Sequence, residues 1–306
     1  MAQTSRLVLG LLLAFLLFLA GLALVHPGLY GWTLFALIPA ALGGLSCWIF
    51  RPGTENRAAG IGALTAGAGA CSLLALGMEG AVCILMCLPL VMFFGAIGGA
   101  LAHAALSSRR AARGLTMLLL LPPATLTWDM KATPPLYEVR SSVEIAANPE
   151  QVWKHVVAFS PLPEPDEWYF RAGLAYPQRA RIEGSGPGAI RYCEFSTGPF
   201  VEPIEVWDEP RLLRFRVTDN PAPMQEWSPY SQIQPKHLHG YLVARQGEFR
   251  LLQLPNGHTL LQGTTWYQHG LWPAQYWRWW SGAIIHRIHL RVLNHVRTLA
   301  EAESKR

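Results

Sequence analysis

The stretch VRSSVEIAANPEQVWKHVVAF, residues 139–159, decides the fold of the second half of this chain. In its first part Val139, Val143 and Ile145 alternate with polar residues, which is typical of a strand with one buried face. The pattern predicts a strand from Tyr137 to Ile145 that belongs to a soluble sheet.

The second part of the stretch begins a helix. Asn148 is a favourable N-cap, Pro149 suits the first helical position, and Gln151 stands where a capping box needs its third residue. Apolar residues then recur on one face of the helix: Val152, Trp153, Val156 and Val157. A second short helix is predicted over residues 166–172.

Downstream of these helices the sequence predicts a run of antiparallel strands. Their expected ranges are 176–183, 189–197, 201–208, 212–218, a strand resuming near 238, and 260–269. Asn256-Gly257 marks the tip of the last hairpin. A long Pro-rich insertion, residues 220–234, interrupts the series.

One long amphipathic helix, residues 273–301, is predicted to close the chain. Apolar residues recur on it at steps of three and four: Trp277, Trp280, Ile284, Ile288, Val292, Val296 and Leu299. Arginines lie largely off this stripe, so one face is expected to pack against the sheet.

The first 128 residues have a different character. Four apolar stretches, 7–25, 32–50, 58–77 and 81–106, are each long enough to cross a hydrocarbon core of roughly 30 Å. Arginines flank the second loop and follow the fourth stretch, whereas the first and third loops carry no Lys or Arg. This asymmetry predicts a cytoplasmic N-terminus.

The side of the membrane on which the soluble half lies depends on the segment from Leu115 to Trp128. The segment is short for a span, and Pro122-Pro123 would kink it. If it crosses the membrane with Arg113 near the interface, the soluble half lies on the outer face, which we favour. If it lies flat, that half is cytoplasmic. An integral protein of the plasma (inner) membrane is expected in either case.

Charge and cysteine usage narrow the function. Residues 129–306 hold 19 basic and 18 acidic side chains, so the basic balance comes from the membrane loops. A nucleic-acid partner is therefore not expected, because it would need a basic face on the folded domain. Only Cys193 lies in the soluble half, which excludes a disulfide within it.

The order of elements resembles a known superfamily. The opening VRSSVEIAANPEQVWKHVVAF is similar to the start of START-like, or SRPBCC, proteins, which include polyketide cyclase/dehydrase and lipid-transfer proteins and the major birch pollen allergen family. GPGAIRYCEFSTGPFVEPIEVWDEPRLLRFRV resembles their central hairpins. GHTLLQGTTWYQHGLWP with the long helix after it resembles their final hairpin and gripping helix. The resemblance covers about residues 137–300.

This resemblance implies an α+β helix-grip domain, in which a curved antiparallel sheet surrounds a long C-terminal helix. It also implies a cavity for an apolar or amphipathic small molecule. The expected organisation is an all-α transmembrane region of four or five helices over 1–128, a linker over 129–136, and the helix-grip domain over 137–306. The insertion at 220–234 departs from the shorter family pattern at the expected rim of the cavity.

Seven residues are candidates for the ligand site. Trp277, Trp280, Ile284 and Ile288 would line the cavity from the last helix, or would be plain core. Trp266 on the last strand faces either in or out. Tyr192 and Glu194 share one face of their strand. If that face points into the cavity, Glu194 is a buried carboxylate with a raised pKa. The alternative for Glu194 is a solvated or arginine-paired surface residue.

No catalytic residue, metal or cofactor is assigned. His286 and His289, or His237 and His239, have spacings that suit metal ligands, but no Cys or acid accompanies them at typical spacing. Dinucleotide, P-loop and nucleophile-elbow motifs do not occur.

The expected function is a membrane-anchored protein that binds a hydrophobic or lipid-like small molecule. One alternative is a cyclase- or hydrolase-like enzyme that uses Glu194 or a histidine as general base. Another alternative is a regulatory protein whose pocket is filled by its own side chains. Such a protein would act through a protein partner, which the sequence does not identify.

Overall fold

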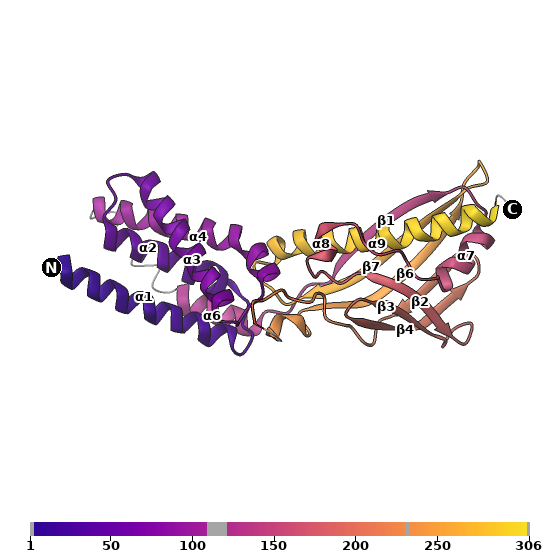
Figure 1. Ribbon diagram of the computed structural model, residues 1–306, viewed down its shortest axis with the longest axis horizontal. Coiled ribbons are helices and arrows are strands. Elements are labelled where there is room, and N and C mark those ends of the chain that lie inside the picture. The colour runs from indigo at the N-terminus through magenta and orange to yellow at the C-terminus, as the bar shows by residue number, and fades with distance from the viewer. Residues whose placement is uncertain (1–2, 109–120, 231–232, 305–306) are drawn as a thin grey trace. The chain divides into compact units, whose positions relative to one another are not determined.

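The computed structural model describes residues 3–108, 121–230 and 233–304, and the chain divides into two compact units (Figure 1). The helical unit comprises Met1–Thr133, Glu226–His237 and Leu271–Ala274, and the sheet unit comprises the rest. Two short segments from within the predicted domain 137–306 thus pack with the helices. The residues of the insertion before Glu226 stay with the sheet unit.

The sheet unit contains one antiparallel sheet of seven strands in the order β1-β7-β6-β5-β4-β3-β2. The strands are β1 (Tyr137–Ile145), β2 (Pro177–Glu183), β3 (Ile190–Phe195), β4 (Gly198–Asp208), β5 (Leu212–Arg216), β6 (Leu242–Gln253) and β7 (Thr259–His269). The final hairpin pairs β6 with β7 and turns at Asn256-Gly257, where Gly257 has a φ of 80°. Each predicted strand is confirmed, with ends shifted by a few residues.

Helix α7 (Pro149–Val157) begins as its sequence indicates. The Asn148 side chain accepts a hydrogen bond from the Gln151 amide at 2.9 Å, and the Gln151 side chain returns one from the Asn148 amide at 3.3 Å. This is the predicted capping box. Val152, Trp153 and Val156 are buried, so the cap fixes the point from which the apolar face enters the core. A short α8 (Trp168–Arg171) follows.

The long C-terminal helix α9 (Ala274–Ser304) packs on the inner face of the sheet (Figure 1). Val292, Leu293 and Val296 are buried in one core with Ile145 of β1 and Leu213 of β5. Farther towards its N-terminus, Ile284 and Ile288 remain half-buried. These two residues line a cavity between the helix and the sheet, whereas Trp277 and Ser281, nearer the N-terminus of α9, are buried. A helix-grip fold is confirmed.

The helical unit contains α1 (Gln3–Val25), a short π-helix η1 (Thr33–Leu37) that continues into α2 (Ile38–Phe50), α3 (Glu55–Ala75), α4 (Ala81–Ser107) and α6 (Leu121–Lys131). Within the described residues, four helical stretches are long and apolar enough to cross a membrane: Gln3–Val25, Thr33–Phe50, Glu55–Ala75 and Ala81–Ser107. They correspond to the four predicted spans.

Small residues bring these helices together. Gly95 of α4 lies against the backbones of Gly43 in α2 and Gly62 in α3, where an added Cβ would collide with a carbonyl group. Gly99 approaches the Ala58 carbonyl in the same way. The Gly95/Gly99 pair is thus a close-packing motif, as its spacing indicates.

The predicted fifth span, 115–128, lies partly outside the described residues. From Leu121 onward the chain forms α6, and the Asp129 carboxylate accepts hydrogen bonds from the Trp32 and Thr33 amides at 2.8 Å each. Asp129 therefore caps the beginning of η1 and anchors α6 to the loop after α1.

Candidate ligand-binding site

A cavity lies within the sheet unit between α9 and the inner face of the sheet. It offers about 150 Å³ to the centres of water-sized molecules. Its wall is mainly aromatic and aliphatic and includes Phe195, Phe200, Phe215, Phe249, Ile284 and Ile288. Asn220, Pro221, Ala222 and Pro223 complete the wall, so the start of the Pro-rich insertion forms part of the cavity rim. Apolar surroundings of this kind favour an apolar ligand.

Arg191 and Glu202 form a buried ion pair in the cavity wall. They are cross-strand partners on β3 and β4, and their side chains are 1% and 8% exposed. The Arg191 Nε also donates to the Val157 carbonyl at 3.1 Å, and its guanidinium lies 5.5 Å from the Phe215 ring centre and 5.4 Å from that of Phe249. With Phe159 at 5.7 Å as well, the arginine is held by a carboxylate, a carbonyl and three aromatic rings.

Burial dominates the acid–base behaviour around this pair. It raises the pKa of Glu202, although Arg191 acts in the opposite direction. Burial also raises the pKa of the Cys193 thiol to about 12. Cys193 is therefore a protonated, unreactive thiol at neutral pH, because the thiolate is the nucleophile.

His289 of α9 brings a neutral polar group to the cavity. Its Nε2 lies 2.8 Å from the Thr265 hydroxyl and its Nδ1 lies 3.1 Å from the Ser141 hydroxyl, which also lies 2.7 Å from His286 Nδ1. Burial, with a smaller contribution from His286, lowers the pKa of His289 to about 4. Either tautomer is satisfied, because both hydroxyl groups can donate or accept.

The structure places Tyr192 and Glu194 on the outer face of the sheet. Arg191 and Cys193 take the inner positions of β3, so the strand alternation turns their neighbours away from the cavity. Glu194 pairs with Arg179 at 2.5 Å and Arg181 at 3.2 Å. The hydrogen bond from Arg179 lowers its pKa despite some desolvation. Glu194 is thus the arginine-paired surface residue of the alternative interpretation.

The aromatic candidates also lie outside the cavity wall. The Trp266 indole donates to Glu138 at 3.1 Å in an exposed contact. Trp277 is buried at 3% exposure and Trp280 is half-buried, and neither lines the cavity, whereas Ile284 and Ile288 do. The helix stripe thus divides into a core part and a cavity part.

Sequence reasoning missed Arg191 and Glu202, and it considered His289 for its metal-ligand spacing with His286. A signal for the first two was present: Arg191 alternates in phase with Cys193, and Glu202 in phase with Ile204, so each charge falls on an apolar face. Their pairing depends on the register between β3 and β4, which the sequence does not state. Among the described residues, the side chains grouped closely enough to hold a metal ion belong to the helical unit and not to this cavity.

A curved antiparallel sheet that encloses a long C-terminal helix and an apolar cavity defines the helix-grip fold. Within this fold, residues 137–267 match the family described as polyketide cyclase / dehydrase and lipid transport. The match covers most of the sheet unit and none of the helical residues before it. No curated protein matches the chain.

Solved structures with a similar fold come from several organisms. A norcoclaurine synthase from Thalictrum flavum is 12% identical, with 57% of this chain and 100% of that chain covered and a TM-score of 0.37. The Zhui aromatase/cyclase from a Streptomyces species is 17% identical, with 56% and 96% covered and a TM-score of 0.34. A protein from Nitrosospira multiformis is 16% identical, with 56% and 100% covered and a TM-score of 0.36. At these identities the likeness carries no assignment of activity.

Proposed function

We propose that this chain is a membrane-anchored protein whose helix-grip domain binds a neutral, hydrophobic small molecule. The observation that carries the proposal is the cavity between the sheet and α9, with its apolar wall and its few satisfied polar groups. The match of residues 137–267 to the family described as polyketide cyclase / dehydrase and lipid transport supports a ligand in this position.

The cavity volume suggests the size of the ligand. A cavity of about 150 Å³ is comparable to one that admits a benzene-sized molecule in another protein. The enclosed part of the ligand is therefore a single ring or a short branched chain, and any longer tail extends through the opening. Each ~100 Å² of apolar ligand surface removed from water contributes roughly 2.5 kcal/mol to binding.

The polar groups suggest the charge of the ligand. Arg191 is already neutralised by Glu202, so an anionic ligand would have to displace a buried carboxylate from its partner. His289 is uncharged at neutral pH and shares hydrogen bonds with Thr265 and Ser141. A ligand hydroxyl or carbonyl group can exchange hydrogen bonds with this network without introducing a charge.

The membrane part of the proposal depends on the four apolar helices. Positive residues in the second loop and after α4 favour a cytoplasmic N-terminus. With a fifth crossing near residues 115–128 the helix-grip domain lies on the outer face, where it can receive a molecule that leaves the bilayer. Fusions of alkaline phosphatase or a fluorescent protein to the C-terminus test this: phosphatase activity places the domain outside, and fluorescence alone overturns the sidedness.

The decisive experiment identifies what the cavity holds. The full chain is purified in detergent, and the molecules it retains are measured by native mass spectrometry and by extraction. Ile288→Trp should deplete a stoichiometric ligand because Ile288 lines the cavity, whereas Thr298→Trp, at an exposed position of the same helix, should retain it. Absence of any molecule that distinguishes the two variants would overturn the proposal.

Catalysis is the second candidate function, and His289 is the group that favours it. It lines the cavity and can exchange a proton with Thr265. Its lowered pKa of about 4 makes it a weak base at neutral pH. For an enzyme using this group, His289→Gln should abolish turnover of the identified ligand while leaving its binding intact; unchanged turnover would exclude the role.

A further inference from the structure

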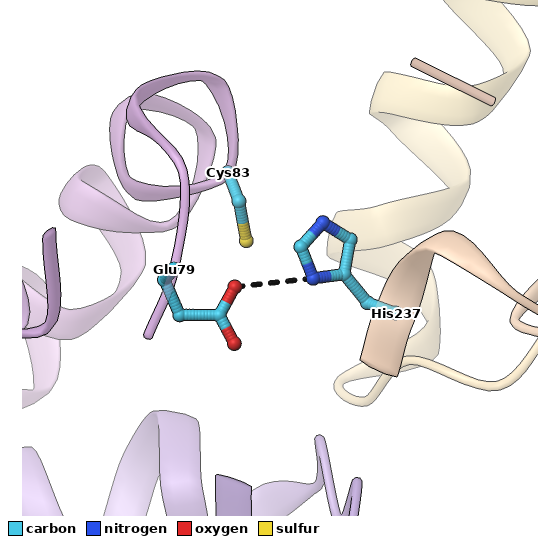
Figure 2. Close-up of side chains that lie close together, drawn as sticks. All are labelled: Glu79, Cys83 and His237. Carbon is cyan, nitrogen blue, oxygen red and sulfur yellow. Dashed lines mark ion pairs between the residues drawn. The ribbon is translucent and has the colours of Figure 1, made fainter. Parts of the chain in front are cut away.

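A second cluster of chemically active side chains lies inside the helical unit. Glu79 belongs to the turn before α4, Cys83 to the first turn of α4, and His237 to the short helix η3 (Lys236–Leu238). Figure 2 shows the three side chains pointing towards one another. Their ligand atoms all lie within 4.8 Å of one another, and the residues are 2%, 9% and 6% exposed.

A fourth residue, Glu226, contacts His237 at Nε2, the ring nitrogen that does not face Glu79. Its carboxylate accepts hydrogen bonds from the Val82 and Cys83 amides at 3.0 Å each, which fixes it at the beginning of α4. Glu226 Oε1 also lies 3.3 Å from His237 Nε2. A carboxylate on one ring nitrogen leaves the other, Nδ1, facing the cluster, an arrangement common in histidine–metal sites.

Two buried atoms at the centre of the cluster lack hydrogen bonds. Tyr30 donates its hydroxyl to Glu79 Oε1 at 2.6 Å, which leaves Glu79 Oε2 facing His237 Nδ1. These two atoms approach to 3.1 Å as an ion pair, yet neither has a hydrogen-bond partner. Buried polar atoms are normally satisfied, so each such exception calls for an explanation such as an ion.

Space for an additional ligand adjoins the cluster. A cavity of about 80 Å³, measured as the space open to the centres of water-sized molecules, is lined by both Glu79 and Cys83. Its remaining wall is largely apolar and includes Leu73, Ile84 and Val91. An ion at the cluster would therefore have one side open to a water molecule or a small ligand.

We propose that Glu79 Oε2, Cys83 Sγ and His237 Nδ1 bind a divalent transition-metal ion of the zinc type. The mixed oxygen, sulfur and nitrogen set suits a borderline-soft ion. Bond lengths of about 2.0–2.3 Å place tetrahedral donors roughly 3.5 Å apart, so Glu79 Oε2 and His237 Nδ1, now 3.1 Å apart, would separate slightly, and the wider separations, all within 4.8 Å, would close. Glu226 then acts as a positioning residue that holds the imidazole.

The competing state contains a proton in place of the ion. Against the effect of burial, the carboxyl groups of Glu226 and Glu79 beside the imidazole raise the pKa of His237 to about 9. A protonated His237 between two carboxylates is a sufficient explanation of the cluster if no metal binds. The two states differ in the thiol, since a metal ion requires Cys83 as thiolate.

Cobalt provides a test that reports this thiolate directly. The full chain in detergent is stripped with a chelator and titrated with Co²⁺. We expect one equivalent to bind with a sulfur-to-cobalt charge-transfer band, and Zn²⁺ to displace it. Cys83→Ser should lose the band, whereas Cys87→Ser, one helical turn later and also buried, should keep it. Glu226→Gln should weaken Co²⁺ binding about 10- to 100-fold.

The proposal is overturned if the wild-type chain shows no sulfur-to-cobalt band, or if Cys83→Ser retains it. If a variant does not elute as a folded species, the wild-type chain still decides the question through alkylation. Zn²⁺ should slow alkylation of Cys83, identified by peptide mapping, relative to Cys71, which is exposed. Equal rates with and without Zn²⁺ would favour the proton-filled cluster.

Discussion

Arg191 and Glu202 face each other across β3 and β4 as an ion pair that is almost fully withdrawn from solvent. Both charges lie in the wall of an otherwise apolar cavity. Desolvating two charges is costly, so the pair stabilises the fold only while both members are present. This dependence can be measured.

Removing one member of the pair should destabilise the protein strongly. We expect Arg191→Met or Glu202→Leu alone to lower the free energy of unfolding by about 3–5 kcal/mol, because each leaves a buried charge without its partner. The double variant should recover most of this loss. Unfolding followed by tryptophan fluorescence tests the prediction, and additive effects of the two substitutions would contradict it.

His289 should make stability depend on pH in the acid range. Its pKa is lowered from 6.5 to about 4 by burial, so between these pH values the unfolded chain binds a proton that the folded chain does not. Stability therefore falls as the pH decreases through this window, by at most about 1.4 kcal/mol per pH unit.

The matched control for this effect is His289→Gln. Glutamine can still hydrogen-bond to Ser141 and Thr265 but does not titrate. The difference in unfolding free energy between the wild type and this variant should change from pH 7 to pH 5, while both share the contributions of all other groups. A difference that is independent of pH would exclude His289 as the cause.

Gly95 should be essential for packing of the helical unit. A side chain at this position would collide with the Gly62 backbone and the Ala66 side chain, so Gly95→Leu should separate the helices and lower the melting temperature in detergent. Gly60 of α3 has open space at its Cβ position, and Gly60→Leu should be neutral or slightly stabilising. Equal effects of the two substitutions would refute a close-packing role.

The N-cap of α7 should contribute a measurable part of the sheet unit's stability. Asn148→Ala removes the side-chain acceptor for the Gln151 amide and should cost about 1 kcal/mol. Asn148→Asp keeps an acceptor and should restore most of the loss. Thermal unfolding of both variants checks the prediction, and it fails if they behave alike.

The local elements of this protein could be predicted because each follows from neighbouring residues. The alternation of Val139, Val143 and Ile145 with polar residues was sufficient to predict strand β1. The Asn148–Gln151 capping box was sufficient to predict where α7 begins. Ile284 and Ile288 line the cavity, and their four-residue spacing already put them on one face of the helix. These features have periods of two or about 3.6 residues, which are visible in the chain itself.

The inward face of β3 was harder to predict. Alternation divides the strand into two faces but does not say which one is buried. The register with β4 and the position of α9 select Arg191 and Cys193, and leave Tyr192 and Glu194 outside. The sequence therefore predicts two faces for β3, and tertiary packing determines which of them is buried.

By itself, the sequence determined the helix-grip order of elements and four apolar stretches of membrane-spanning length, because both depend on local periodicity and composition. Only the tertiary structure decided which charges meet. Arg191 and Glu202 are joined by strand register, whereas Glu79 and His237, which are far apart in the sequence, meet because the segment 226–237 packs with the helices. Contacts of this kind arise from how the chain folds back on itself, and local propensity does not encode them.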